Sequence, residues 1–293
     1  MINKLKWMLI ALVMGTCAPA LSHAQGNKAG GSKWPLPKSF VSPKANTIDY
    51  KERLAPFFKK LADYEKAVTQ GNDSLPKPRV MMIGDSHVRG NILPRQVRDS
   101  LAQVWDIDFK YFCKNGVQLN YFVKQEQMDT ILAYNPDLLI VAVGTNEAHS
   151  NFVAKRYTDL MQRFVDQVLT GTDSTTTIMF TTPPGSHKRM STKTSKGRSR
   201  TSIVPNDTNK DVADCQNQFC KDNGFAIWNL LEIAGGKEAP RNWREAQLMQ
   251  KDGIHYTVNA YRLQGNMLAW ALIDARKTLS QRERQHGNKK VND

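Results

Sequence analysis

The stretch Val80-Met81-Met82-Ile83-Gly84-Asp85-Ser86-His87 decides the fold class of this chain. A short apolar run ends in a Gly-Asp-Ser turn, and a helical pattern begins near Asn91. A buried strand, a turn and a helix in succession are the unit from which open parallel sheets are built. A serine at the end of such a strand lies where hydrolases with an α/β fold place their nucleophile. The stretch therefore predicts a sheet strand and a candidate nucleophile, Ser86.

Strand and helix patterns alternate along the chain after this point. The run Asp137 to Val143 is apolar throughout, as expected for a strand buried on both faces. The alternation predicts an α/β fold, an open parallel sheet of about five strands with helices on both faces. The predicted strands are 80–83, 107–112, 137–143, 176–181 and 225–228, and the predicted helices between and after them are 92–104, 119–133, 152–169, 212–223 and 258–275.

Residues 1–24 have the composition of a secretory signal peptide. Lys4 and Lys6 precede an apolar run at 7–13, and Ser22-His23-Ala24 forms a small-x-Ala cleavage site. We therefore expect an exported protein of the periplasm or the extracellular space. No other segment is apolar enough to span a bilayer, so no stable membrane span is expected. Lipoprotein processing at Cys17 is the alternative, and the preceding Thr16 disfavours it.

The remaining chain divides by composition. Residues 25–46 have linker composition, and residues 47–78 contain an amphipathic pattern from Tyr50 to Val68 that predicts a packing helix. Residues 79–279 are expected to form the main domain. Within it, 184–207 is predicted to be a polar, basic loop. The polar tail at 280–293 is expected to fray.

The formal charge of the chain is +14, and removal of Lys4 and Lys6 with the signal leaves +12. Such a basic exported protein could bind acidic envelope polymers or membrane surfaces, although a solvated surface explains most of these charges equally well. The basic residues form no nucleic-acid-binding motif, so no nucleic-acid partner is expected. Three cysteines would remain after cleavage (Cys113, Cys215 and Cys220), which allows one tertiary disulfide but no disulfide framework.

A serine hydroxyl needs an adjacent base to act as a nucleophile at neutral pH. The candidate base is His255, and Asp252 precedes it closely enough for one turn to hold both side chains. Asp252 could fix the imidazole tautomer that accepts the serine proton. The alternative is structural: Ser86 as a helix cap, Asp252 as an N-cap and His255 as a packing residue.

Acyl transfer also needs hydrogen-bond donors directed at the developing oxyanion. Three donors follow strands that end at the same edge of the predicted sheet: the backbone N–H of Ser86, the backbone of Gly116 and the side-chain amide of Asn146. Ligands of open parallel sheets bind at this edge. No Cys/His spacing resembles a zinc site, so neither a metal nor a cofactor is expected.

Four blocks now stand in order: Gly-Asp-Ser-His at 84–87, Asn-Gly at 115–116, Gly-Thr-Asn-Glu at 144–147 and Asp-Gly-Ile-His at 252–255. Over residues 79–277 the chain resembles the SGNH (GDSL-type) esterase superfamily. The resemblance implies a three-layer α/β/α, flavodoxin-like fold. It also implies Ser86 as nucleophile, His255 with Asp252 as the base pair, and Ser86, Gly116 and Asn146 as the oxyanion hole.

Two positions depart from the general pattern of that superfamily. His87 replaces the usual leucine and Glu147 the usual aspartate, and both resemble a bacterial envelope sub-branch that removes O-acetyl groups from peptidoglycan or related glycans. His87 and Glu147 are therefore candidate substrate-binding residues, with exposed or loop-surface positions as the alternative. Further segments similar to that sub-branch are Pro205-Asn206, Trp228-Asn229-Leu230, Trp243 and Tyr261-Arg262-Leu263-Gln264-Gly265.

The basic segment from Gly185 to Arg200 should rise at the same edge of the sheet as Ser86, because it follows the fourth strand. Lys193, Lys196 and Arg198 are candidate contacts for an anionic glycan, and a mobile solvated loop is the alternative.

The predicted function is an exported serine esterase that removes O-acetyl groups from a carbohydrate, with an O-acetylated glycan as substrate. An O-acetyltransferase, a lipase or thioesterase, and a glycan-binding module without activity are the rivals. No feature of the sequence fixes the polymer, the acyl group or the oligomeric state.

Overall fold

The computed structural model describes residues 36–40, 44–172, 175–193, 195 and 198–292. The predicted signal peptide with Cys17, the first part of the predicted linker, and Lys196 lie outside the described residues. No described helix has the combined length and apolar character needed to cross a membrane. The three described cysteines, Cys113, Cys215 and Cys220, are all unpaired.

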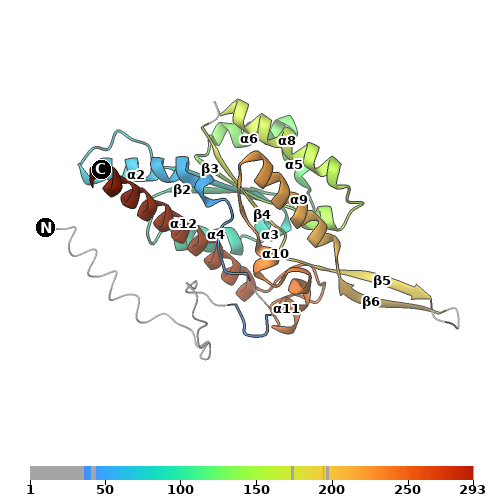
Figure 1. The fold of residues 1–293 in the computed structure, drawn as a ribbon. Coiled ribbons are helices and arrows are strands. Elements are labelled where there is room, and N and C mark those ends of the chain that lie inside the picture. The colour runs from blue at the N-terminus through green and yellow to red at the C-terminus, as the bar shows by residue number, and fades with distance from the viewer. Residues whose placement is uncertain (1–35, 41–43, 173–174, 194, 196–197, 293) are drawn as a thin grey trace. The chain divides into compact units, whose positions relative to one another are not determined.

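A five-stranded parallel sheet forms the centre of the domain, with the strand order β2-β1-β3-β4-β7 (Figure 1). The prediction of an α/β fold around a five-stranded parallel sheet is therefore confirmed. The strands are β1 (Arg79–Gly84), β2 (Asp108–Cys113), β3 (Leu138–Ala142), β4 (Thr177–Thr181) and β7 (Ala226–Trp228).

Alternate side chains of the central strands enter two separate cores. In β1, Val80 and Met82 belong to one core, whereas Met81 and Ile83 belong to the other. This follows from the two-residue period of a strand, which points successive side chains to opposite faces. Because helices cover both faces of the sheet, the central strands are continuous apolar runs in the sequence.

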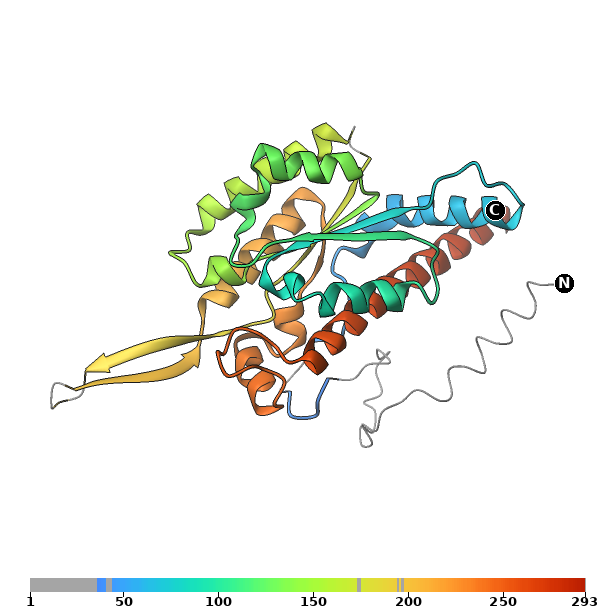
Figure 2. The ribbon, with the colours of Figure 1, turned by 180° about the vertical axis from the view of Figure 1, so that it is seen from behind.

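Helices cover both faces of the sheet, giving three layers (Figures 1 and 2). One face carries α2 (Ala55–Thr69), α4 (Ile92–Leu101) and α12 (Val258–Asn292), and the 3₁₀ helix η1 (Lys51–Leu54) leads into α2. The other face carries α5 (Leu119–Phe122), α6 (Gln125–Tyr134), α8 (Ala154–Gly171) and α9 (Thr208–Asn223). The single helix predicted at 119–133 is thus two helices.

Helices α12 and α4 lie in close contact. Gly265 of α12 permits this approach, because a Cβ atom there would lie 2.7 Å from Cβ of Gln96 and 3.0 Å from the carbonyl oxygen of Leu93. The neighbouring Asn266 accepts hydrogen bonds from the side chains of Gln96 and Ser100 at 2.9 and 2.7 Å. The absence of a side chain at Gly265 and the hydrogen bonds of Asn266 together fix the position of α12 along α4.

Short helices lie near the carboxyl ends of the strands. They are α3 (Ser86–Arg89), α7 (Thr145–Ala148), α10 (Leu230–Ile233), η2 (Gly236–Glu238) and α11 (Ala239–Glu245). Two of them, α3 and α7, begin directly after β1 and β3 and carry residues of the predicted site.

The segment predicted to be a polar loop at 184–207 is instead an antiparallel hairpin. Its strands are β5 (His187–Lys193) and β6 (Ser199–Pro205), and the hairpin projects away from the main sheet (Figures 1 and 2). The loop prediction was wrong because the segment is polar and basic. A solvent-exposed ribbon has no buried face, so it needs no apolar alternation to form strands.

Two further segments differ from the sequence prediction. Helix α12 continues to Asn292, through most of the tail that was expected to fray; Gln, Arg and Glu in this tail are good helix formers. The described part of the predicted linker lies against the domain. The ring of Phe40 packs edge-on against Trp243, with centroids 4.9 Å apart, and Asn46 donates to the carbonyl of Met267.

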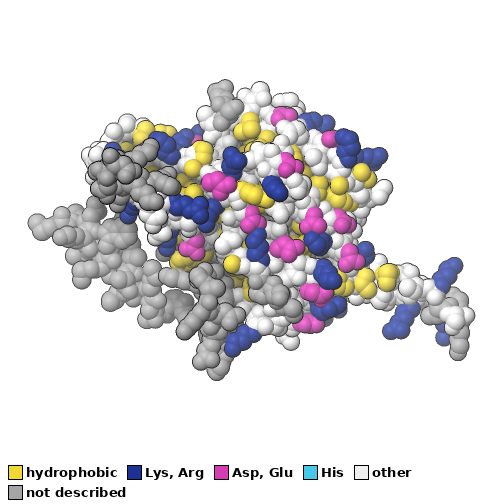
Figure 3. Space-filling model, viewed as in Figure 1, with side chains coloured by type: hydrophobic (Ala, Val, Ile, Leu, Met, Phe, Trp, Pro, Cys, Tyr) yellow, Lys and Arg dark blue, Asp and Glu magenta, His cyan; other side chains and the backbone are white. Residues whose placement is uncertain are grey.

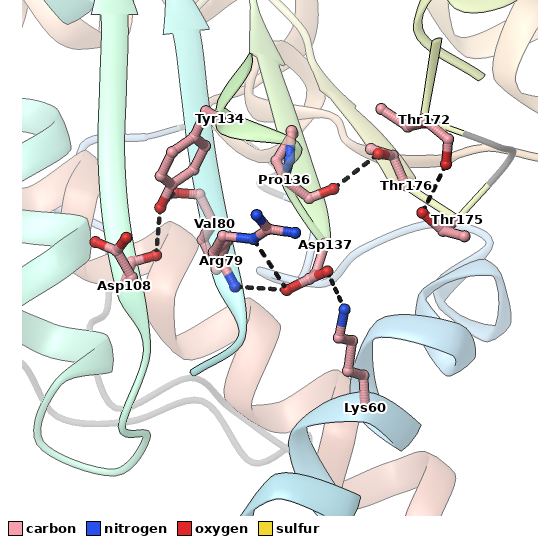
Figure 4. A network of polar contacts seen from close by, with 10 residues as sticks. All are labelled: Lys60, Arg79, Val80, Asp108, Tyr134, Pro136, Asp137, Thr172, Thr175 and Thr176. Carbon is pink, nitrogen blue, oxygen red and sulfur yellow. Dashed lines mark hydrogen bonds and ion pairs between the residues drawn. The ribbon is translucent and has the colours of Figure 1, made fainter. Parts of the chain in front are cut away.

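A polar network ties the amino ends of the strands together, at the edge opposite the predicted site (Figure 4). The buried carboxylate of Asp137 accepts a 2.7 Å hydrogen bond from the backbone N–H of Arg79 and pairs with Lys60 of α2. Nearby, the hydroxyl of Tyr134 donates to the carbonyl of Asp108 at 2.9 Å. The carboxylate therefore links β1, β3 and α2.

Replacing Asp137 by Ala should lower the free energy of unfolding by about 1–3 kcal/mol, because the partly buried N–H of Arg79 would lose its partner. Urea denaturation measures this change. Asp63→Ala is the control, since its exposed pair with Lys59 should contribute less than about 1 kcal/mol. Equal effects of the two substitutions would contradict a structural role for the buried carboxylate.

Candidate active site

The turn after β1 places Ser86 at the first position of α3. The turn is tight: a Cβ atom on Gly84 would lie 2.3 Å from the side chain of Val88 and 2.6 Å from the carbonyl oxygen of Ala142. Asp85 caps α3, because its carboxylate accepts the backbone N–H of His87 at 2.9 Å. The sequence Gly-Asp-Ser thus fixes the turn and holds the serine at the carboxyl edge of the sheet.

Ser86, His255 and Asp252 form a continuous hydrogen-bonded chain. The hydroxyl oxygen of Ser86 lies 2.9 Å from Nε2 of His255. Nδ1 of His255 lies 2.7 Å from Oδ2 of Asp252. The structure therefore brings together the three residues expected to act as nucleophile, base and orienting carboxylate, in the order that nucleophilic catalysis requires.

The carboxylate of Asp252 also shapes the loop that carries the imidazole. Its Oδ1 accepts the backbone N–H groups of Ile254 and His255, both at 2.9 Å. Partial burial acts to raise the pKa of Asp252, but the hydrogen bonds from His255 and from these N–H groups outweigh it and lower the pKa. Asp252 is therefore a carboxylate at neutral pH, which favours the tautomer of His255 that accepts a proton from Ser86.

The expected oxyanion donors lie around the same turn. Gly116 follows β2 with a φ of +69°, and Asn146 is the second residue of α7. The side-chain amide of Asn146 donates to the carbonyl of Val117 at 2.8 Å and to Asp85 at 3.2 Å. One amide thus contacts both the turn after β1 and the turn after β2. The structure places all three strand-end blocks beside Ser86.

His87 does not occupy the exposed position that a substrate contact needs. Its side chain is buried, and Nδ1 lies 2.9 Å from the hydroxyl of Tyr261. Its ring centroid lies 5.6 Å from that of His255. Burial lowers the pKa of His87 to about 3, so the ring is neutral. Helix α3 thus turns this side chain inward toward Tyr261, and the substrate-binding role of His87 stays a prediction.

Glu147 is likewise buried rather than exposed to substrate. One carboxylate oxygen accepts the backbone N–H of Leu119 at 2.7 Å, which ties α7 to α5. Burial raises the pKa of Glu147 to about 7. Its contacts are those of a residue that anchors the helix carrying Asn146, and its substrate-binding role stays a prediction.

The basic candidates lie on the hairpin. Lys193 is the last residue of β5, and Arg198 immediately precedes β6; both side chains are exposed. Lys196 lies outside the described residues. These cations are therefore beyond the hydrogen-bonded chain of Ser86, on an element that projects from the edge where that chain lies.

One polar cluster joins side chains from three segments that are far apart in the sequence. Nε2 of His149 lies 2.8 Å from the hydroxyl of Ser186, which also donates to Asn209 at 3.1 Å. Burial and the nearby Lys188 lower the pKa of His149. The cluster links α7, the start of the hairpin and α9, and only the tertiary fold brings these three segments together.

A family model described as GDSL-like Lipase/Acylhydrolase matches residues 80–268. The chain belongs to this family. Its members are esterases and acylhydrolases, so the protein is a GDSL-like ester hydrolase, and the resemblance to the SGNH superfamily is confirmed. The matched range begins at β1 and ends within α12, so it includes all four blocks around Ser86.

Several solved structures are similar to this GDSL-like protein, and one of them superimposes well enough to show a common fold. A structure of a peptidoglycan O-acetylesterase superimposes with a TM-score of 0.64 at 16% identity, covering 79% of this chain and 99% of that chain. A GDSL-like lipase from Bacteroides thetaiotaomicron has a TM-score of 0.47 at 15% identity, covering 73% and 99%. The psychrotrophic esterase EstA from Pseudoalteromonas sp. has a TM-score of 0.48 at 15% identity, covering 69% and 98%. No curated protein matches the sequence significantly.

The raised pKa of Glu147 predicts a pH-dependent effect of Glu147→Gln. The native state retains a proton on Glu147 up to about pH 7, against 4.5 for an ordinary glutamate. The contribution of this group to stability is therefore present below pH 4.5 and is lost as the pH rises through about 7. Gln has no proton to lose, so the variant should gain stability relative to the wild type between pH 5 and 8, by up to about 3 kcal/mol.

Urea denaturation at several pH values measures this difference. Asp85 and His87 are present in both proteins, so the difference reports the titration of Glu147 together with its electrostatic coupling to Asp85. Glu126→Gln on the exposed face of α6 should show no such trend. A stability difference between Glu147→Gln and the wild type that is constant with pH would contradict the raised pKa.

Proposed function

We propose that this protein is an exported serine esterase that removes O-acetyl groups from a carbohydrate of the cell envelope. The observation that supports it most strongly is the hydrogen-bonded chain from Ser86 through His255 to Asp252, with distances of 2.9 and 2.7 Å. Export is supported by the signal-like composition of residues 1–24.

In this mechanism Ser86 attacks the carbonyl carbon of the acetyl ester while its proton passes to Nε2 of His255. Asp252 stabilises the imidazolium that forms. The tetrahedral intermediate collapses, the C–O bond to the sugar breaks, and His255 returns the proton to the departing sugar oxygen. Water, deprotonated by His255, then attacks the acetyl-enzyme, releases acetate and restores Ser86.

Three groups are proposed to stabilise the tetrahedral oxyanion: the backbone N–H groups of Ser86 and Gly116, and the side chain of Asn146. The Asn146 amide donates to Val117 at 2.8 Å and to Asp85 at 3.2 Å. The longer contact, to Asp85, is the one we expect the amide to exchange for the oxyanion. Donors fixed in advance stabilise charge in the transition state without reorganising.

The choice of substrate rests on three separate lines of support. A peptidoglycan O-acetylesterase shares the fold at a TM-score of 0.64. The resemblance of His87 and Glu147 to an envelope sub-branch points in the same direction. The formal charge of the chain, +14 in full and +12 without the signal, suits a polymer that carries carboxylates. Acetate release from O-acetylated peptidoglycan, compared with acetylated xylan, tests the preference directly.

Two enzymatic rivals use the same residues. An O-acetyltransferase would pass the acetyl group from Ser86 to a sugar hydroxyl instead of water, and acetylated acceptor in a donor-plus-acceptor assay would favour it. A lipase or thioesterase would prefer long acyl chains or thioesters. A series of 4-nitrophenyl esters of increasing acyl-chain length distinguishes a lipase from a deacetylase. A deacetylase should lose activity when the acyl chain exceeds a few carbons.

Replacing Ser86 by Ala should abolish labelling by a fluorophosphonate probe and reduce acetate release at least roughly 10³-fold, because the nucleophile is lost. Gel fluorescence and an acetate assay measure the two effects. Ser150→Ala, a nearby hydroxyl outside the hydrogen-bonded chain, is the matched control. Wild-type protein that neither labels nor hydrolyses any ester would favour a glycan-binding module without activity.

Replacing Asn146 by Ala should lower kcat about 10²–10³-fold with little change in KM, because the amide acts mainly on the transition state. Steady-state kinetics with a small acetyl ester measure this. Gln118→Ala is the control, since its side chain contacts only the backbone carbonyl of Asn146, at 3.1 Å. Comparable losses in both variants would instead indicate that α7 has shifted.

A further inference from the structure

The hairpin of β5 and β6 begins between the two loops that hold the candidate catalytic groups. At its base the N–H of His187 donates to the carbonyl of Gly253 at 2.7 Å, within the loop of the candidate base. The side chain of Asn206 donates to the carbonyl of Ala148 at 2.7 Å, at the end of the helix that carries the oxyanion amide. The base of the hairpin is therefore attached to the loop of His255 and to the end of α7.

The hairpin carries positive charge only. Residues 185–206 contain no Asp or Glu, and the described cations among them are Lys188, Arg189, Lys193, Arg198 and Arg200. On the helices, acids stand one turn from lysines, as in Lys155–Asp159 and Lys210–Asp214. Figure 3 shows Lys and Arg side chains on the projecting hairpin, whereas acidic and basic groups are mixed over the rest of this face.

The two strands pair only with each other, so both outer edges of the hairpin lack a neighbouring strand. Isolated two-stranded hairpins are marginally stable in water. Exposed apolar side chains accompany the cations: Met190 is 45% exposed and Ile203 is 39% exposed. Arg189 and its cross-strand partner Ile203 lie on one face of the hairpin. Met190, the next residue along β5, lies on the opposite face. Each face thus combines a polar strand surface with an apolar contact.

The register also spreads the cations along the length of the hairpin. Arg189 and Lys193 lie on the same face of β5, about 13 Å apart at the usual rise of a strand. Arg200 lies opposite Thr192 on the other face. This spacing suits an extended partner with repeated negative charges better than one small anion.

We propose that the β5–β6 hairpin is a docking arm for a glycan strand that carries carboxylates and that it presents the O-acetyl groups of this strand to Ser86. The carboxylates pair with the arginine and lysine side chains, and on the face that Arg189 and Lys193 share, the C–H faces of the sugar rings lie against Ile203. This inference rests on the proposed esterase function, because the arm determines which polymer reaches the site and takes no part in the chemistry.

The test removes three charges at once: Arg189→Gln, Lys193→Gln and Arg200→Gln. All three side chains are exposed and lie outside the catalytic groups. On O-acetylated peptidoglycan, KM should rise about tenfold, since exposed charge pairs contribute modestly and together. The kinetics on a small acetyl ester and on neutral acetylated xylan should not change. Added salt should raise the KM of the wild type on peptidoglycan and have little effect on the variant.

Two matched variants distinguish the effect of positive charge on the hairpin from the effect of the net charge of the protein. The charge-keeping variant Arg189→Lys, Lys193→Arg, Arg200→Lys should retain most of the activity on peptidoglycan. The same number of exposed cations removed elsewhere, by Lys66→Gln, Lys124→Gln and Arg163→Gln, should leave KM unchanged. Thermal melting confirms that each variant folds.

Equal kinetics of the charge-removed variant and the wild type on peptidoglycan, with normal hydrolysis of the small ester, would overturn the docking arm and leave the esterase function intact. Wild-type protein that does not hydrolyse the small ester would overturn the esterase function instead. Sedimentation with vesicles containing anionic phospholipid tests a membrane partner. Vesicle binding that depends on the three cations, with unchanged peptidoglycan kinetics, would also overturn the proposal.

Discussion

The hydrogen bond between Ser86 and His255 depends on more of the structure than any other contact of the site, because the two residues are 169 positions apart. Ser86 is fixed by the turn after β1, which the close approach of Gly84 to Val88 makes tight. His255 is fixed just before α12, and α12 is held along α4 by the close approach at Gly265. Displacements of about 1 Å in such geometry can cost a hundredfold in rate, so the packing of this layer is part of the catalytic apparatus.

Burial separates the charges around this hydrogen bond into two groups. Burial raises the pKa values of Asp85 and Glu147 to about 7 and lowers that of His87 to about 3, so the interior beneath the site favours neutral side chains. Asp252, at the surface, keeps its carboxylate because hydrogen bonds from its own loop stabilise the charged form. The negative charge that acts on His255 is therefore concentrated on the one carboxylate in contact with it.

The hairpin shows that the carboxyl edge of the sheet offers more than a reaction centre. Its base is hydrogen-bonded to the loop of His255 and to the end of α7, so the hairpin is attached directly to the segments that carry the site. Ester hydrolysis needs only the groups around Ser86. In the role proposed for the hairpin, its cations select the polymer that reaches these groups, so polymer binding and ester chemistry depend on different residues.

The sequence by itself determined the five strands, the layers and the positions of Ser86, Asn146, Asp252 and His255 at strand and loop ends, because buried parallel strands need continuous apolar runs and turns need particular residues. It did not determine the side-chain directions of His87 and Glu147, which depend on how short helices pack. It also missed the hairpin, whose strands are exposed and carry no hydrophobic period. Only the tertiary structure decided these features, since each depends on contacts between segments far apart in the chain.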